Sequence, residues 1–135
     1  MVTDHCSRRA MGFAVFQKEP DSREIRTFGG RLMHQAKATP KYLVCDRGKQ
    51  FWRQGFKDWC QRKEIRPRFG AVGRHGSIAV VERFIQTVKV ECTRRLLVSF
   101  RAETFRQELL WFAACYNQHR PHTTLGGRTP DEVYF

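Results

Sequence analysis

Short apolar runs alternate along this chain with longer stretches in which apolar residues recur every three or four positions. Strand-like composition marks residues 41–45 (KYLVC), 65–69 (IRPRF) and 12–16 (GFAVF), and residues 1–4 look like the end of another strand. The helical stretches are 22–36, 51–63, 78–96 and 103–116. This order of strands and helices predicts an α/β domain with a mixed sheet flanked by helices.

Asp46 stands where the predicted strand at 41–45 ends, in the segment YLVCDRGKQF. A carboxylate at the exit of a buried strand is costly unless something binds or solvates it. Ligand sites in open α/β sheets lie at the carboxyl ends of strands, which makes Asp46 a candidate ligand. The plainer alternative is a turn residue, because Asp and Gly together are common in turns.

Glu82 is the second acidic candidate and lies in the strongest predicted helix. The apolar stripe of that helix is Ile78, Val81, Ile85, Val88, Cys92 and Leu96. At about 100° per residue, Glu82, Gln86 and Lys89 share a face beside this stripe. Taken alone, Glu82 would be an ordinary surface acid. Together with Asp46 it could share a hard divalent cation, because Mg²⁺ prefers oxygen ligands.

The charge of the chain indicates what kind of partner such a site would meet. Lysine and arginine number 25 against 13 acidic residues, a formal net charge of +12 spread along the whole sequence. The natural partner of this surface is a polyanion, although a basic face kept for solubility is the plainer explanation.

The cysteines and the hydropathy indicate the compartment. Five cysteines without regular spacing argue against a disulfide framework and fit a reducing cytosol. No apolar run approaches the ~20 residues that span a bilayer, and the N-terminus lacks a signal-peptide pattern. We therefore expect a cytoplasmic protein without a membrane partner.

Four motifs together resemble a known family. Asp46 and Glu82 have 35 residues between them, as do the second and third acids of the D,D(35)E pattern. CDRGKQF resembles the family's Asp-x-Gly-x-x-Phe turn, HGSIAVVERFIQTVKVE its last catalytic helix, and YNQHRPHTTLGGRTPDEVY its C-terminal signature. The chain is thus similar to the integrase catalytic core (DDE) of IS3-type and IS481-type insertion-sequence transposases and of retroviral integrases.

This resemblance implies an RNase H-like fold with sheet order 3-2-1-4-5. It also implies DNA cleavage and strand transfer that use Mg²⁺ or Mn²⁺, with Asp46 and Glu82 as metal ligands. Lys89 occupies a position where the family commonly places a lysine toward the DNA end. The other expected DNA contacts are Gln86, Arg47, and Arg74 and His75 of a glycine-rich loop.

The resemblance covers residues 1–135, with the core strands and helices in 1–97 and a C-terminal helix and tail in 98–135. The family's first catalytic aspartate stands on a strand upstream of the segment that VTDHCSR matches. We therefore expect a domain truncated at its N-terminus, lacking the first, central strand and the third metal ligand. Asp4 is expected to bond the turn at Ser7 and Arg8 instead of replacing that ligand.

The expected function is DNA transposition or integration, by a transposase fragment that is incomplete and not active alone. Its partners would be insertion-sequence ends, target DNA, and an upstream transposase product or a second copy of the chain. Whether the chain itself is an enzyme stays open. The alternatives are a non-catalytic DNA-binding remnant and a decayed reading frame whose product is mostly unfolded.

Two other groups of residues have plainer explanations. Trp52, Phe56 and Trp59 recur at helical spacing and are expected in the core, not as platforms for stacking bases. Cys115, His119 and His122 hint at zinc, but no fourth ligand is evident.

Overall fold

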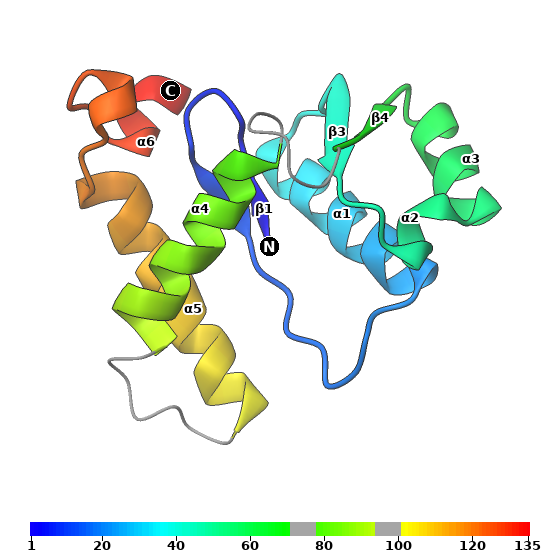
Figure 1. Ribbon diagram of the computed structural model, residues 1–135, viewed down its shortest axis with the longest axis horizontal. Coiled ribbons are helices and arrows are strands. Elements are labelled where there is room, and N and C mark those ends of the chain that lie inside the picture. The colour runs from blue at the N-terminus through cyan, green and yellow to red at the C-terminus, as the bar shows by residue number, and fades with distance from the viewer. Residues whose placement is uncertain (71–77, 94–100) are drawn as a thin grey trace. The chain divides into compact units, whose positions relative to one another are not determined.

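The computed structural model describes residues 1–70, 78–93 and 101–135 (Figure 1). The chain forms two compact units. The terminal unit consists of Met1–Val15 and Val80–Phe135, and the middle unit consists of Phe16–Ala79. Each unit has a hydrophobic core of its own.

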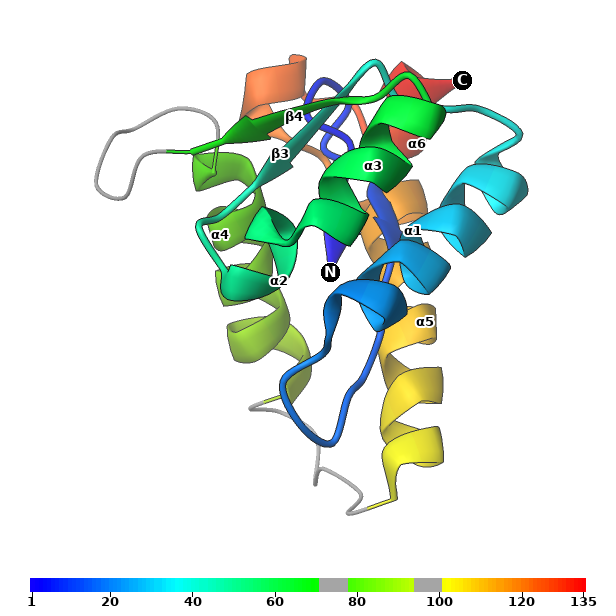
Figure 2. The ribbon, with the colours of Figure 1, turned by 90° about the vertical axis from the view of Figure 1, so that its right-hand side faces the viewer.

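The middle unit is built on a parallel pair of strands. These are β3 (Tyr42–Cys45) and β4 (Arg66–Phe69), in register from Tyr42 opposite Arg66 to Cys45 opposite Phe69. Three helices accompany them: α1 (Ser22–Ala36), α2 (Lys49–Trp52) and α3 (Gln54–Arg62). Figure 2 shows β3 and β4 side by side with α3 next to them. The buried side chains of this core are Cys45, Phe56, Trp59, Cys60 and Ile65.

Helix α1 has the bounds that the sequence predicts because local signals set both of its ends. Asp21 accepts a hydrogen bond from the backbone N–H of Glu24 (2.8 Å), and the Glu24 carboxylate accepts one from the N–H of Asp21 (2.9 Å). This capping box satisfies two N–H groups that a helix start leaves without partners. At the other end Lys37 turns left-handed, with φ 50°.

The predicted helix 51–63 is wrong in one respect, because it is two helices. Arg53 is extended, with φ −66° and ψ 142°, and separates α2 from α3. Phe56 and Trp59 are buried in the core as expected, but Trp52 lies before the break and is 48% exposed. The expectation that Trp52 is a core residue is therefore wrong.

The two glycines of α1 make a matched pair for a stability prediction. A Cβ atom at Gly29 would lie 2.9 Å from Cη2 of the buried Trp59, whereas a Cβ at Gly30 would meet nothing within 4 Å. Alanine favours a helix over glycine by about 1 kcal/mol, so we expect Gly30→Ala to raise the free energy of unfolding by about that amount. Gly29→Ala should lower it, because the indole must move. Urea unfolding of both variants measures the difference, and equal stabilisation would contradict this packing.

The terminal unit combines a short antiparallel hairpin with helices. Its strands are β1 (Val2–Thr3) and β2 (Ala10–Gly12). The helices are α4 (Ala79–Thr87), which continues as a π-helical segment (Val88–Thr93), α5 (Ala102–His119), a 3₁₀ turn (Thr123–Leu125) and α6 (Pro130–Tyr134). The buried side chains of this core are Ala10, Phe13, Phe84, Val88, Cys92, Leu109, Ala113 and Tyr116.

The core face of α4 and the π-helical segment includes Val88 and Cys92 of the predicted stripe, but it also includes a residue outside that stripe. Phe84, which the stripe omits, is almost fully buried, and Ile85 is only partly buried. The Phe84 ring lies 5.6 Å from that of Phe13 and 4.8 Å from that of Tyr116, measured between centroids. Aromatic packing across the unit thus sets the orientation of the helix, and apolar spacing within the helix does not reveal it.

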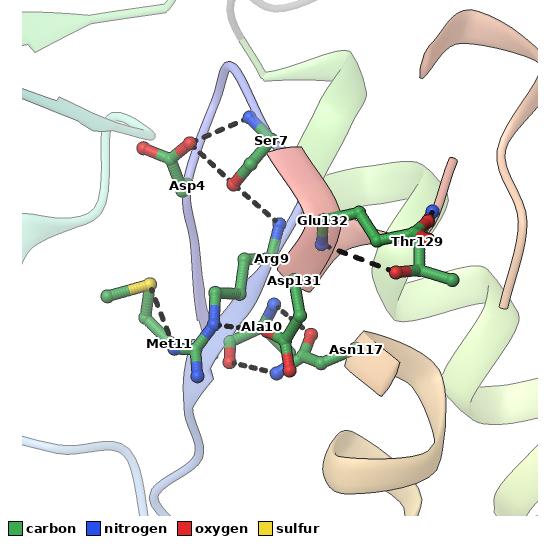
Figure 3. Close-up of polar contacts among 9 residues, drawn as sticks. All are labelled: Asp4, Ser7, Arg9, Ala10, Met11, Asn117, Thr129, Asp131 and Glu132. Carbon is green, nitrogen blue, oxygen red and sulfur yellow. Dashed lines mark hydrogen bonds and ion pairs between the residues drawn. The ribbon is translucent and has the colours of Figure 1, made fainter. Parts of the chain in front are cut away.

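Polar contacts fasten the hairpin to the C-terminal helices (Figure 3). The buried Asn117 accepts a hydrogen bond from the N–H of Ala10 (2.8 Å) and donates one to its carbonyl (3.0 Å). Arg9 forms an ion pair with Asp131 of α6 at 2.6 Å. The asparagine of the YNQHRPH segment therefore has a structural role.

Strand pairing in the described residues is limited to β1 with β2 and β3 with β4. One pair is antiparallel and the other is parallel, and among the described residues they form two separate two-stranded sheets. The expected flanking helices are also present in both units.

Candidate active site

Asp46 begins the turn that follows β3, and its side chain is exposed. Oδ1 accepts a hydrogen bond from the backbone N–H of Gly48 at 2.9 Å. Asp46 therefore does act as a turn residue, which is the plainer alternative given by the sequence. The carboxylate makes no ion pair with any residue that the structure describes. One hydrogen bond fixes its orientation and leaves Oδ2 open to a ligand.

Gly48 allows this close approach. A Cβ atom at this position would lie 2.5 Å from Nε2 of Gln50 and 2.9 Å from Oδ1 of Asp46. Any other residue would therefore displace the Gln50 side chain or the carboxylate. Gly48 thus serves the geometry of the acid.

The β3–β4 pairing places Asp46 at a definite edge of the middle unit. Cys45 is the register partner of Phe69, and the N–H of Gly70 donates to the carbonyl of Cys45 at 3.0 Å. Because the strands are parallel, both of their carboxyl ends meet here. Asp46 therefore lies at the edge of the sheet where ligands of α/β folds bind.

The neighbouring thiol is not a second ligand. Burial, with smaller effects of Cys60 and Asp46, raises the pKa of Cys45 to about 12. The thiolate is the form that binds metals or attacks a substrate. Cys45 therefore stays protonated at neutral pH and offers no thiolate to a metal, which leaves the Asp46 carboxylate as the candidate ligand of this turn.

Glu82, Gln86 and Lys89 are predicted site residues that lie in the terminal unit. All three are exposed, whereas Phe84 and Val88 are buried. Helical geometry places Glu82 and Gln86 one turn apart on the face opposite Phe84. Glu82 makes no ion pair within the described segments, so its carboxylate is available to a ligand.

A family model described as Integrase core domain matches residues 63–130 of this chain. The chain belongs to the integrase core domain family. The matched range contains Glu82, Gln86 and Lys89, while Asp46 precedes it. A comparison with curated proteins finds no significant match.

Solved structures with the same fold match most of the length of this integrase core. A chain of the simian T-cell lymphotropic virus intasome, in complex with PP2A regulatory subunit B56 gamma, matches with a TM-score of 0.73 and 17% identity. That match covers 90% of this chain and 43% of the intasome chain, so this chain spans less than half of its length.

Two catalytic core domains match as well. The BIV integrase core has a TM-score of 0.67 and 21% identity, over 95% of this chain and 78% of that one. The HTLV-2 integrase core, in complex with magnesium, has a TM-score of 0.64 and 18% identity, over 87% and 72%. These likenesses show that the fold is the RNase H-like fold of integrase catalytic cores.

The remaining predicted site residues of the integrase core fall in different places. Arg47 is exposed beside Asp46. Arg74 and His75 lie outside the described residues, so their predicted DNA contacts stay predictions. Asp46 and Arg47 share one turn of the middle unit, and Glu82, Gln86 and Lys89 share one face of the terminal unit.

The Asp4 carboxylate accepts the hydrogen bonds of a local turn, as the sequence predicts. Its Oδ2 accepts the N–H of Cys6 (3.1 Å) and both the N–H and the hydroxyl of Ser7 (2.8 Å each; Figure 3 shows the Ser7 bonds). In residues 1–70, 78–93 and 101–135, no three histidine, cysteine or acidic side chains are grouped to hold a metal ion. The zinc alternative at Cys115, His119 and His122 therefore has no support.

No described helix combines the length and the apolar character that crossing a bilayer requires.

Trp52 is the residue at this edge that the sequence interpretation missed. Its ring stacks on Phe69 of β4, which is the register partner of Cys45. Gly55, in the middle of the predicted helix, is the signal that could have indicated the break and hence the exposure of Trp52.

Proposed function

We propose that this integrase core acts in DNA transposition or integration, by metal-dependent strand cleavage and strand transfer, as part of an insertion-sequence transposase of the IS3 or IS481 type. The observation that carries the proposal is the pair of exposed carboxylates, Asp46 and Glu82, with the family's spacing and without ion pairs among described residues. Membership of the integrase core domain family supports it.

The donor set fits a hard divalent cation. Oδ1 of Asp46 accepts the Gly48 N–H, and neither Asp46 nor Glu82 forms an ion pair with a described residue. Mg²⁺ in phosphoryl-transfer sites is bound by one or two carboxylates, with water and phosphate oxygens as the other ligands. Mn²⁺ suits the same oxygen ligands. When bound, such an ion would stabilise the charge that develops on phosphate oxygens.

In this proposal the chain's own groups bind and orient the DNA backbone. Lys89 and Gln86 extend from the same helix face as Glu82, where an ammonium and an amide can both donate to phosphate. Arg47 does the same beside Asp46, because a guanidinium can bind phosphate in a bidentate manner. Arg74 and His75 are proposed as further contacts. The net charge of +12 favours DNA as the partner.

The third carboxylate of the family's site is not supplied by Asp4, whose Oδ2 is engaged in its turn. We therefore propose that cleavage requires a further aspartate, supplied by a strand of an upstream transposase product. The same observation favours a second candidate function, that of a non-catalytic DNA-binding remnant of an insertion sequence.

A plasmid-nicking assay tests this proposal. The chain is expected to bind DNA with an affinity that falls steeply with salt, because lysine and arginine release counterions from phosphates. Nicking of supercoiled plasmid is expected when the chain is extended by a family member's first strand and given Mg²⁺ or Mn²⁺. EDTA should abolish that nicking, and so should Asp46→Asn.

Two other results would contradict the proposed enzymatic function. Salt-sensitive binding without nicking by the extended chain, at any metal concentration, would support the DNA-binding remnant and exclude the enzyme. Absence of DNA binding at low salt would exclude both functions.

A further inference from the structure

Trp52 presents a large aromatic surface at the same edge as Asp46. The residue is 48% exposed, and its ring lies 4.6 Å from that of Phe69 at an interplanar angle of 16°. Phe69 covers one face of the indole in this parallel stack. A tryptophan that served only to fill the core would be expected to be buried.

The core of the middle unit does not depend on this indole. Phe56 is fully buried, and it packs against Phe51 and Trp59 with ring centroids 5.2 and 5.9 Å apart. The extended backbone at Arg53 places Trp52 outside that group. Among the described aromatic rings, Phe69 is the one that stacks on this indole. The Lys57 ammonium also lies over the ring, and about half of the residue stays open to solvent.

The position of Phe69 places the stack beside the candidate carboxylate. Phe69 ends β4 and is the register partner of Cys45, and Asp46 is the next residue after Cys45. Trp52 itself ends α2, which follows the Asp46 turn. An aromatic surface and an open carboxylate oxygen therefore occur at one edge of one unit.

The charges around Trp52 suit a nucleic acid. Lys57 places its ammonium 5.2 Å from the centre of the indole ring. Arg47, Lys49 and Arg53 are exposed in the same segment, against one acid, Asp46. Cations can contact the phosphodiester backbone, and an aromatic face can stack on a base of any sequence.

We propose that Trp52 stacks on an unpaired nucleobase of DNA bound at the Asp46 edge. This inference rests on the proposed function. It adds the class of DNA that is bound, which is a strand end or junction with an unpaired base. Bases inside a duplex are stacked on their neighbours, so an aromatic side chain gains a contact mainly where a base is unpaired. Trp52 then favours DNA ends over continuous duplex.

A binding experiment with matched DNA probes separates the base from the phosphate. The probes are a blunt duplex, the same duplex with a one-nucleotide 3′ overhang, and the same overhang carrying an abasic sugar. The abasic probe keeps the phosphate and lacks the base. We expect the full 135-residue chain to bind the overhang about tenfold more tightly than the abasic probe.

Three variants test which side chain reads the base. Trp52→Leu keeps apolar cover on Phe69 but lacks an aromatic ring, so it should bind the overhang and abasic probes equally. Trp52→Phe should keep part of the preference. Trp111→Ala removes a tryptophan of α5 that is 73% exposed, and it should leave the preference unchanged. Circular dichroism checks that each variant is folded.

The outcomes distinguish this inference from the proposed function. DNA binding without a difference between the overhang and abasic probes would overturn the stacking and leave the proposed function standing. An unchanged preference in a folded Trp52→Leu variant would also overturn it. A protein-binding role for Trp52 predicts that result. If the chain binds no DNA at all, both proposals fail.

Discussion

Replacing Asn117 by alanine is expected to lower the free energy of unfolding by about 2–4 kcal/mol. Asn117 is buried and makes both an accepted and a donated hydrogen bond with the backbone of Ala10, which is also buried. The variant would leave the N–H and the carbonyl of Ala10 without these partners. A buried polar group left unpaired loses its hydration as well as its bond, and this cost sets the size of the effect.

Gln118→Ala is the matched control, because Gln118 is the next residue of α5 and is exposed. Both substitutions gain helix propensity, but the control removes no buried bond, so it should change stability by less than about 0.5 kcal/mol. Urea unfolding followed by circular dichroism measures both variants. If Asn117→Ala proves as mild as its control, the two bonds to Ala10 do not hold the hairpin.

The sequence predicts the fold best where local signals decide the structure. Helix α1 follows its predicted range because Asp21 and Glu24 form a capping box within four residues of chain. Strand β3 was recognisable from a short apolar run before Asp46. Both elements are determined by neighbours in sequence.

Prediction failed where distant contacts decide. The orientation of Phe84 depends on Phe13 and Tyr116, which come from other parts of the chain. Trp52 is turned out of the core at the break at Arg53 and stacks on Phe69 of another element. The spacing of apolar residues within one helix predicts neither contact, because each contact is made with a residue of another element.

For the candidate site, the sequence indicated the chemistry and the structure adds the state of each side chain. Spacing and family resemblance selected Asp46 and Glu82, and both are exposed without ion pairs to described residues. The hydrogen bond from Gly48 that orients Asp46 could not be read from spacing. That the two acids share one ion is a proposal, since they belong to different units.

Loss of either acid is expected to weaken divalent-metal binding by more than about tenfold, because Asp46 and Glu82 are proposed to be the two protein ligands of one ion. Asp46→Asn and Glu82→Gln keep the shape of each side chain and remove its charge. Asp58→Asn is the control, because Asp58 is an acid of α3 that hydrogen-bonds Gln54. Titration with Mn²⁺ should distinguish the two site variants from this control.

Paramagnetic broadening of backbone amide signals by Mn²⁺ tests the shared site most directly and requires no catalytic activity. We expect the amides around Asp46 and those around Glu82 to broaden at the same Mn²⁺ concentration, and excess Mg²⁺ to reverse both effects. Either Asp46→Asn or Glu82→Gln should abolish the broadening at both places. Broadening confined to one of the two segments, or persisting at one when the other acid is replaced, would show that the carboxylates do not hold a common ion.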